Sequence, residues 1–230
     1  MASASAAAVK VSDLTLSVSG GEGWYWLPLE VDWVAPTAGA MTGLIFPNLD
    51  DSVAGWHGQA LDSSVNDGTS LAHAQLTTRT SSDMNGVTAM ASVNANGGQS
   101  GWAFANVFDG QILVGGNATI TVSAKLDSID ATGSMAQANA YIELCSTDFT
   151  TDVCSPLNFA EAFVDAFTPT YSGPSILTAS WTNPGATAWA KMHIGLTASA
   201  ESVATALPEP ASLALCAVGL AGIGFCRRRA

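Results

Sequence analysis

Apolar and polar residues alternate one by one along most of this chain, which is the period of a β-strand with one buried face. Residues 14–19 show the pattern in its simplest form, with leucine or valine at the even positions and threonine or serine at the odd positions. No stretch before residue 207 has the 3.6-residue apolar period of an amphipathic helix. The alternation predicts strands at 14–19, 24–34, 41–46, 71–80, 87–93, 102–114, 118–126, 138–144, 176–181 and 188–196.

Turn signals separate these segments. Gly20-Gly21, Asn85-Gly86, the NANGG at 94–98 and the GGN at 115–117 are typical of chain reversals. The TNPGA at 182–186 predicts a final hairpin between the last two strands. Many short strands with frequent turns and no intervening helix predict an all-β fold, an antiparallel β-sandwich that is jelly-roll-like. The expected domain covers 9–196, and the small, polar residues 197–206 are expected to form a tether.

The last 24 residues, 207–230, have a different pattern. Pro208-Glu209-Pro210 comes first, and its two prolines prevent a helix from running through it. The apolar run 211–226 follows, and as a helix it would cover roughly 24 Å, a little less than the ~30 Å hydrocarbon layer. Arg227, Arg228 and Arg229 then form a basic stop that favours the cytoplasmic side. A core helix would not end in three arginines, so the order predicts a short C-terminal transmembrane helix.

This tail resembles the PEP-CTERM sorting signal of exopolysaccharide-producing Gram-negative bacteria. Residues 207–212, LPEPAS, match the box of that signal position by position, and the apolar helix and basic terminus follow in the same order. The resemblance is confined to 207–230. It implies an exosortase as partner, a transient inner-membrane intermediate, removal of the tail, and delivery to the cell surface or the biofilm matrix.

The N-terminus fits export less directly. Residues 1–8, MASASAAA, have no basic region and no run of large apolar residues. They look like the small-residue end of a signal peptide, so we interpret them as a remnant whose true start lies upstream. The alternative is a short N-terminal segment with no targeting role.

Charge restricts the partners. Of the 230 residues only 11% are charged, yet the formal net charge is −12. Four basic residues remain once the tail is set aside, namely Lys10, Arg79, Lys125 and Lys191. A surface so poor in Lys and Arg cannot neutralise phosphates, which excludes nucleic acid as a partner.

Two cysteines bracket a polar loop. Cys145 and Cys154 enclose eight residues rich in Ser, Thr and Asp, which predicts a disulfide-closed hairpin loop in an exported protein. Such a bond would stabilise the fold by about 3 kcal/mol on the chain-entropy estimate. A zinc site would need a second ligand pair, and no His lies nearby.

Candidate catalytic and metal-binding residues are few. Glu30 and Asp32 share one face of a predicted strand and could act together on a sugar, although a solvated strand has the same spacing. Asp50-Asp51 is predicted to lie in a turn and is the candidate for a structural calcium ion. The three histidines are scattered, and no nucleophile elbow, P-loop or dinucleotide motif is present. We therefore expect no enzymatic activity and no cofactor.

Aromatic residues offer a different chemistry, because exposed rings can stack on sugars. Tyr25 alternates with Trp24 and Trp26, so at least one ring must leave the core, and Trp56 follows a Pro/Asn/Asp loop. Tyr25 and Trp56 are thus candidate carbohydrate contacts, whereas the alternative makes most of the tryptophans core anchors. The combined prediction is an exosortase-sorted surface or matrix protein, a structural or adhesive β-domain that associates with exopolysaccharide. One alternative is a secreted glycoside hydrolase or lyase using Glu30 and Asp32, and another is a passive surface protein whose Ser/Thr residues carry glycans.

Overall fold

The computed structural model describes residues 4–21, 24–25, 37–42, 49–54, 60–77, 86–147 and 154–203. Every regular element in these ranges is a strand. The strands are β1 Ser5–Ser19, β2 Trp24–Tyr25, β3 Thr37–Thr42, β4 Leu49–Ala54, β5 Leu61–Asn66, β6 Leu71–Thr77, β7 Thr88–Ala95, β8 Ser100–Val114, β9 Thr119–Thr132, β10 Met135–Thr147, β11 Cys154–Asp165, β12 Ile176–Thr182 and β13 Ala188–Glu201. The predicted all-β class is confirmed. Within those ranges no helix is long and apolar enough to cross a bilayer, and the helix predicted at 211–226 lies outside them.

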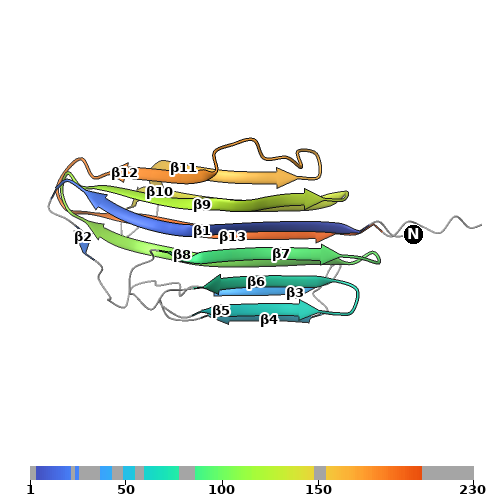
Figure 1. The fold of residues 1–230 in the computed structure, drawn as a ribbon. Helices are drawn as coiled ribbons and strands as arrows, with labels where there is room; N and C mark the ends of the chain where they lie inside the picture. The colour runs from blue at the N-terminus through green and yellow to red at the C-terminus, as the bar shows by residue number, and fades with distance from the viewer. Residues whose placement is uncertain are drawn as a thin grey trace, which may run out of the picture.

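The strands form two antiparallel sheets that pack face to face (Figure 1). Sheet A has the order β12-β9-β1-β7-β6-β5, and sheet B has the order β11-β10-β13-β8-β3-β4 with β2 beside β8. Strands at the same place in the two orders lie over one another, so that β9 covers β10 and β7 covers β8 (Figure 1). The predicted antiparallel sandwich is therefore the observed architecture.

The eight central strands follow the winding of a jelly roll. The antiparallel pairs β10·β11, β9·β12, β8·β13 and β7·β1 alternate between sheet B and sheet A. In a regular jelly roll, the strand after β13 would pair with β7. Here β1, the first strand of the chain, takes that position. The remaining strands extend both sheets on the same side, with β6 and β5 beyond β7, and β3 and β4 beyond β8.

The predicted final hairpin is wrong. β12 pairs with β9 in sheet A, whereas β13 lies between β10 and β8 in sheet B, so the TNPGA connection crosses from one sheet to the other. Buried Asn183 holds this crossing: its side-chain amide donates to the carbonyls of Val114, Gly115 and Ala186, at 3.0, 3.1 and 2.6 Å. A turn signal specifies that the chain reverses, and it does not specify which sheet receives the next strand.

Both ends of the domain extend beyond the predicted limits of 9–196. Residues 5–8, assigned to a signal-peptide remnant, lie in β1 and pair with β7 and β9. They continue the strand because Ala7 fills an inward position ahead of Val9. The signal-peptide origin of 1–8 stays a prediction.

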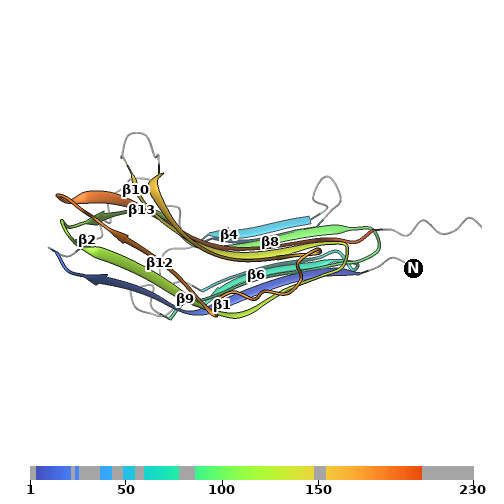
Figure 2. The same cartoon turned by 90° about the horizontal axis from the view of Figure 1, so that it is seen from above.

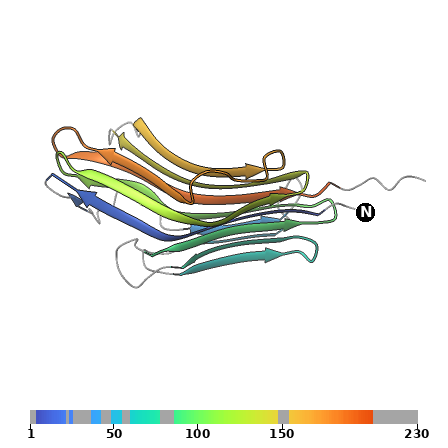
Figure 3. The same ribbon diagram turned by 45° about the horizontal axis from the view of Figure 1, so that its top comes forward.

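The tether predicted at 197–206 is shorter than expected. Residues 197–201 belong to β13, where Ala198 and Ala200 are buried. Ser202 is buried as well: its hydroxyl accepts hydrogen bonds from the amides of Gly98 and Gln99 at 2.8 and 3.0 Å. The small residues of this segment therefore fit the core instead of forming a free linker. Figure 3 shows β1 beginning and β13 ending at the same end of the sandwich.

The core between the sheets is lined largely by small side chains. Ala136, Ala138 and Ala140 of β10 face inward, as do Ala103 and Ala105 of β8. Figure 2 shows both sheets bending in the same direction, with sheet B on the inside of the bend. The outer face of sheet B is therefore concave along its strands.

Candidate functional site

Sheet B places small residues inside and large aromatic residues outside. On β8, Ala103 is buried and its neighbours Trp102 and Phe104 face outward, with Trp102 40% exposed. On β11, buried Ala162 stands next to exposed Phe163, and Phe159 is exposed on the same side. Folding alone favours the opposite arrangement, because a ring gains more than a methyl group from leaving water. This inversion marks the outer face of sheet B as a candidate binding surface.

The outward residues align in rows across four strands. We call the outer surface formed by Trp102, Phe104, Tyr141, Phe159, Phe163 and Phe167 the aromatic face. One row of the register is Phe104, Thr197, Asn139 and Phe163, and the neighbouring row is Trp102, Ser199, Gln137 and Asp165. Because β13 and β10 lie between β8 and β11, the two ends of a row are about 14 Å apart. The face thus has rings at the ends of its rows and hydroxyl and amide groups between them, over the length of an extended ligand.

Trp102 and Phe104 form one end of this surface. Their ring centroids are 4.8 Å apart with an interplanar angle of 29°, which is a stacked pair. The two residues alternate on β8 and so present both rings to the same side of the sheet. Stacking restricts the rotamers of both rings, which reduces the entropy lost when a ligand covers them.

Tyr141 lies across the centre of the face because its neighbour is a glycine. A Cβ added to Gly195 would meet the Tyr141 hydroxyl oxygen at 2.5 Å. The hydroxyl oxygen is 3.0 Å from His193 Nε2, and the two rings contact edge to face with centroids 4.8 Å apart. His193 Nδ1 lies 3.4 Å from Glu143 Oε2. The histidine is therefore held between a phenol and a carboxylate, and the phenol is held flat on the sheet.

Polar side chains between the rings are oriented for hydrogen bonding. The Asn139 amide nitrogen donates to Glu161 Oε1 at 2.7 Å, while its Oδ1 atom is buried and has no hydrogen-bond partner among the described residues. Buried oxygens of this kind are normally satisfied by a donor.

The charge on this face is negative. Glu143, Glu161, Asp165 and Glu201 lie on its strands, and Lys191 is the one lysine or arginine in the described strands of sheet B. The face therefore offers carboxylate acceptors and little to attract an anion.

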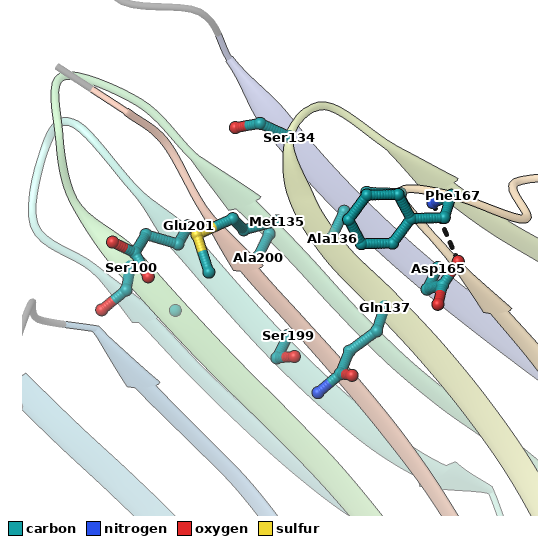
Figure 4. Close-up of a pocket in the computed structure, with 12 residues that line it drawn as sticks. Ser100, Ser134, Met135, Ala136, Gln137, Asp165, Phe167, Ser199, Ala200 and Glu201 are labelled. Carbon is teal, nitrogen blue, oxygen red and sulfur yellow. Dashed lines mark hydrogen bonds between the residues drawn. The ribbon is translucent and has the colours of Figure 1, made fainter.

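At one end of the face there is a hollow of about 400 Å³ (Figure 4). Phe167 and Met135 line different sides of it, and Gln137 of β10 and Ser199 of the neighbouring β13 also line it (Figure 4). Asp165 Oδ1 accepts hydrogen bonds from the Thr168 hydroxyl at 2.7 Å and from the amides of Thr168 and Phe167 at 2.6 and 2.9 Å. These bonds, that of the Thr168 hydroxyl foremost, lower the pKa of Asp165 below its ordinary value of 3.8.

The outer face of sheet A carries a ladder of hydroxyl groups instead. Across β9 and β12, Thr119 pairs with Thr182 at 2.8 Å, Thr121 with Ser180 at 2.9 Å, and Ser123 with Thr178 at 3.0 Å. Thr15, Ser17 and Ser19 of β1 stand opposite the same β9 residues. The two hydroxyls of each pair across β9 and β12 therefore hydrogen-bond to each other.

Most of the predicted site residues cannot be placed on this surface. Tyr25 lies in β2, opposite Leu113, but its side chain is outside the described part of the chain. Trp56, Glu30 and Asp32 also lie outside the described residues, as does the sorting segment with Pro208, Glu209, Pro210, Arg227, Arg228 and Arg229. The carbohydrate contacts and the carboxylate pair therefore stay predictions.

The turn predicted at Asp50-Asp51 is wrong. Both residues lie in β4, opposite Met41 and Ala40 of β3. An extended strand does not wrap its own oxygens around a cation as a calcium-binding loop does. Within the described ranges, no group of three or more His, Cys, Asp or Glu residues is arranged to hold a metal ion.

The two predicted disulfide cysteines lie on adjacent strands. Cys154 stands opposite Thr147, two residues beyond Cys145 on β10, and Cys145 is buried. The side chain of Cys154 is outside the described residues, so the bond stays a prediction.

Sequence reasoning missed Phe159, Phe163 and Phe167. The segment 154–165 was not predicted to be a strand, although its inward Ala160, Ala162 and Val164 alternate with these larger residues. The available signal was a strict alternation of small apolar residues with a series of phenylalanine and acidic residues.

The C-terminal segment matches the family model of the PEP-CTERM protein-sorting motif over residues 206–229. No curated protein and no solved structure matches the chain. The predicted resemblance of the tail is therefore confirmed, and the motif marks an exported, exosortase-sorted protein. The comparisons contain no counterpart of the sandwich domain.

Proposed function

We propose that this exported chain, which carries a PEP-CTERM sorting motif, is a non-catalytic adhesive protein that holds exopolysaccharide on the aromatic face of sheet B. The observation that carries the proposal is the inversion of side-chain size on β8 and β11, where alanines face the core and Trp102, Phe159 and Phe163 face water. Sorting to the surface or biofilm matrix places such a face among polysaccharide chains.

The chemistry of the face suits a carbohydrate. A pyranose ring presents an apolar face of C–H groups and a rim of hydroxyls, and the rows across sheet B alternate rings with amides and hydroxyls. A chain that follows the concave bend of sheet B (Figure 2) can stay in contact with the face along its length. Rigid aromatic residues dominate binding energies in such surfaces because they bury a large area with little loss of rotamer entropy.

The test is affinity electrophoresis of the full-length chain, in mild detergent, through gels that contain exopolysaccharide from the producing cells. We expect the double variant Trp102→Ala/Phe163→Ala to bind at least tenfold more weakly, which corresponds to about 1.4 kcal/mol. The matched controls are Leu71→Ala and Ile176→Ala, which remove exposed apolar side chains from sheet A. Unchanged retention of a double variant that melts like the parent would refute the proposal. Trp56→Ala tests the sequence-based contact in the same gel.

A carbohydrate-active enzyme is the second candidate. The contact of Tyr141 with His193, and of His193 with Glu143, favours it because such a chain can move a proton. The carboxylate pair Glu30 and Asp32 is the other candidate for this chemistry. Release of reducing ends or unsaturated ends from the same exopolysaccharide, abolished by His193→Ala or Glu30→Gln/Asp32→Asn, would replace the non-catalytic proposal.

Tail removal and the disulfide are read from one intact-mass measurement on protein recovered from its native cells. We expect a C-terminus near residues 208–212, and a mass lowered by two hydrogen atoms for the Cys145–Cys154 bond. Hexose-sized increments would indicate glycans on Ser/Thr residues. A mass that retains Arg227–Arg229 would make the tail a membrane anchor and leave the matrix location without support.

A further inference from the structure

We infer that the hollow beside Phe167 is a subsite for a neutral, hydroxyl-rich sugar residue, and that it discriminates against acidic sugars. The inference rests on the proposed function of the aromatic face, and it adds the chemical class of the ligand.

Phe167 is the most exposed of the large apolar side chains in the described residues, at 90%. Its backbone is nevertheless held in place, because Asp165 Oδ1 accepts hydrogen bonds from its amide and from the amide and hydroxyl of Thr168. A charged acceptor at the start of a turn fixes the local backbone. A ring that stands on a fixed backbone and is left in water is stabilised when a ligand covers it.

The rest of the hollow offers groups that pair with hydroxyls. Gln137 and Ser199 lie at adjacent positions of β10 and β13, and Ser100 lies beyond them on β8 (Figure 4). Amide and hydroxyl groups both donate and accept, as sugar hydroxyls do. With Met135 and Phe167 as apolar sides, the hollow has the mixed character of a small sugar site.

The charges around the hollow specify a neutral ligand. Asp165 and Glu201 line it, and none of its described lining residues is a lysine or arginine. Lys191 is ten positions from Glu201 along β13, which is about 33 Å. A uronate or sulfate group in the hollow would meet two carboxylates with no lysine or arginine among the described lining residues to compensate, whereas the hydroxyls of a neutral sugar can donate to those carboxylates.

The hollow is continuous with the aromatic face. Ser199, in its lining, stands opposite Trp102 in the register of β13 and β8. A chain lying against Trp102 can therefore continue across β13 and β10 to reach the side of the hollow that carries Phe167, about 14 Å away.

The experiment separates exopolysaccharide of the producing cells into neutral and acidic fractions by anion exchange, and measures retention of the full-length chain in gels containing each. We expect the neutral fraction to retain the protein and Phe167→Ala to bind it about fivefold more weakly. Asp165→Ala should reproduce that loss because the ring is no longer held, and Asp165→Asn should largely keep binding because an amide oxygen still accepts the turn hydrogen bonds. Glu201→Lys should raise retention by the acidic fraction. Ile176→Ala on sheet A is the control.

Retention by the acidic fraction alone, lost in Trp102→Ala/Phe163→Ala, would overturn this inference and leave the proposed function standing. Retention by neither fraction would remove both. Neutral retention that Phe167→Ala leaves unchanged would show that the hollow is not a subsite. If sedimentation showed a dimer that Phe167→Ala dissociates, the hollow would be a contact between two copies of the chain instead.

Discussion

Sheet A and sheet B pack against the same core, but their outer faces carry different side chains. Inward positions on both sheets are mostly alanine, valine, leucine and isoleucine. Outward positions on β9 and β12 include three pairs of hydroxyls that hydrogen-bond to each other, whereas those on β8 and β11 include the exposed rings of Trp102, Phe159 and Phe163. The comparison teaches that the core specifies the fold and the outward series of each strand specifies what the sheet can bind.

The two faces also differ in how completely their groups are satisfied. On sheet A, Thr121 and Ser180 complete each other's hydrogen bonds without a ligand. On sheet B, the Asn139 Oδ1 atom lacks a partner among the described residues, and the Phe167 ring is exposed. A ring that is left in water gains more from being covered by a ligand than hydroxyl groups that are already paired with each other.

The largest effect is expected where the two sheets are joined. Asn183→Ala would leave the carbonyls of Val114, Gly115 and Ala186 without their buried donor, which we expect to lower the free energy of unfolding by about 3 kcal/mol. Chemical denaturation of the full-length chain measures this loss. Asn183 lies in the connection between the sheets and not on the aromatic face. Polysaccharide binding should therefore persist in the fraction of the variant that stays folded. A loss below about 0.5 kcal/mol would show that water replaces the amide.

A smaller effect should be confined to sheet B. In Gly195→Ala, the new Cβ would displace the Tyr141 hydroxyl and break its contact with His193. Because the displaced atoms are the end of a flexible side chain, we expect an almost unchanged melting temperature. Polysaccharide binding should weaken about fivefold, or by about 1 kcal/mol. Gly185→Ala is the matched control, since nothing lies within 4 Å of its added Cβ. Equal effects of the two substitutions would disprove a role for the flat Tyr141 ring.

A still smaller effect is expected on sheet A. Thr121→Ala removes one rung with Ser180 and should lower stability by about 0.5 kcal/mol, without any change in polysaccharide binding. A double-mutant cycle with Ser180→Ala isolates the pair. Weaker binding in Thr121→Ala would break the comparison, because the hydroxyl ladder would then be a ligand surface too.

The smallest effect is a pH dependence at the edge of sheet B. The lowered pKa of Asp165 means that its stabilising hydrogen bonds are complete above pH 3.8 and are lost as the pH falls through the still lower pKa of the folded state. We expect the Thr168 amide resonance to shift with a midpoint below 3.8, and Asp165→Asn to abolish the shift. A midpoint at or above 3.8 would contradict the hydrogen-bonded turn.

The sequence predicted the class of fold and several strands closely, because single alternating segments such as 71–77 and 176–182 have one obvious apolar side. It placed the start of β1 nine residues late, at 14 instead of 5. The reason is a change of phase: Val9 and Val11 face inward before Asp13, which has φ 50°, and Leu14 faces inward after it. The pairing of β1 with β9 is irregular between Ser12 and Thr15, and the inward side changes there. A prediction from alternation alone takes such a change for the end of a strand.

The candidate site was less predictable than the fold. In β11 the outward series mixes Phe159 and Phe163 with Glu161 and Asp165, so the period did not mark these two rings as a surface feature. The sequence did not show whether Trp102 faces the core or the solvent. Its alignment with Ser199 depends on the pairing of β8 with β13, two strands far apart in the chain. The partner of each strand follows from the winding of the whole roll, which local turn chemistry does not encode.

The position of β13 decides how the domain would respond to force. This strand is hydrogen-bonded along its length to β8 on one side and β10 on the other, and it leads directly into the segment that carries the sorting motif. A load drawn along the strand through the tail would act in shear on both ladders together, whereas a peripheral strand such as β11 could be peeled one bond at a time. A load applied at the C-terminal end of the domain would thus be met by a strand that is paired on both sides.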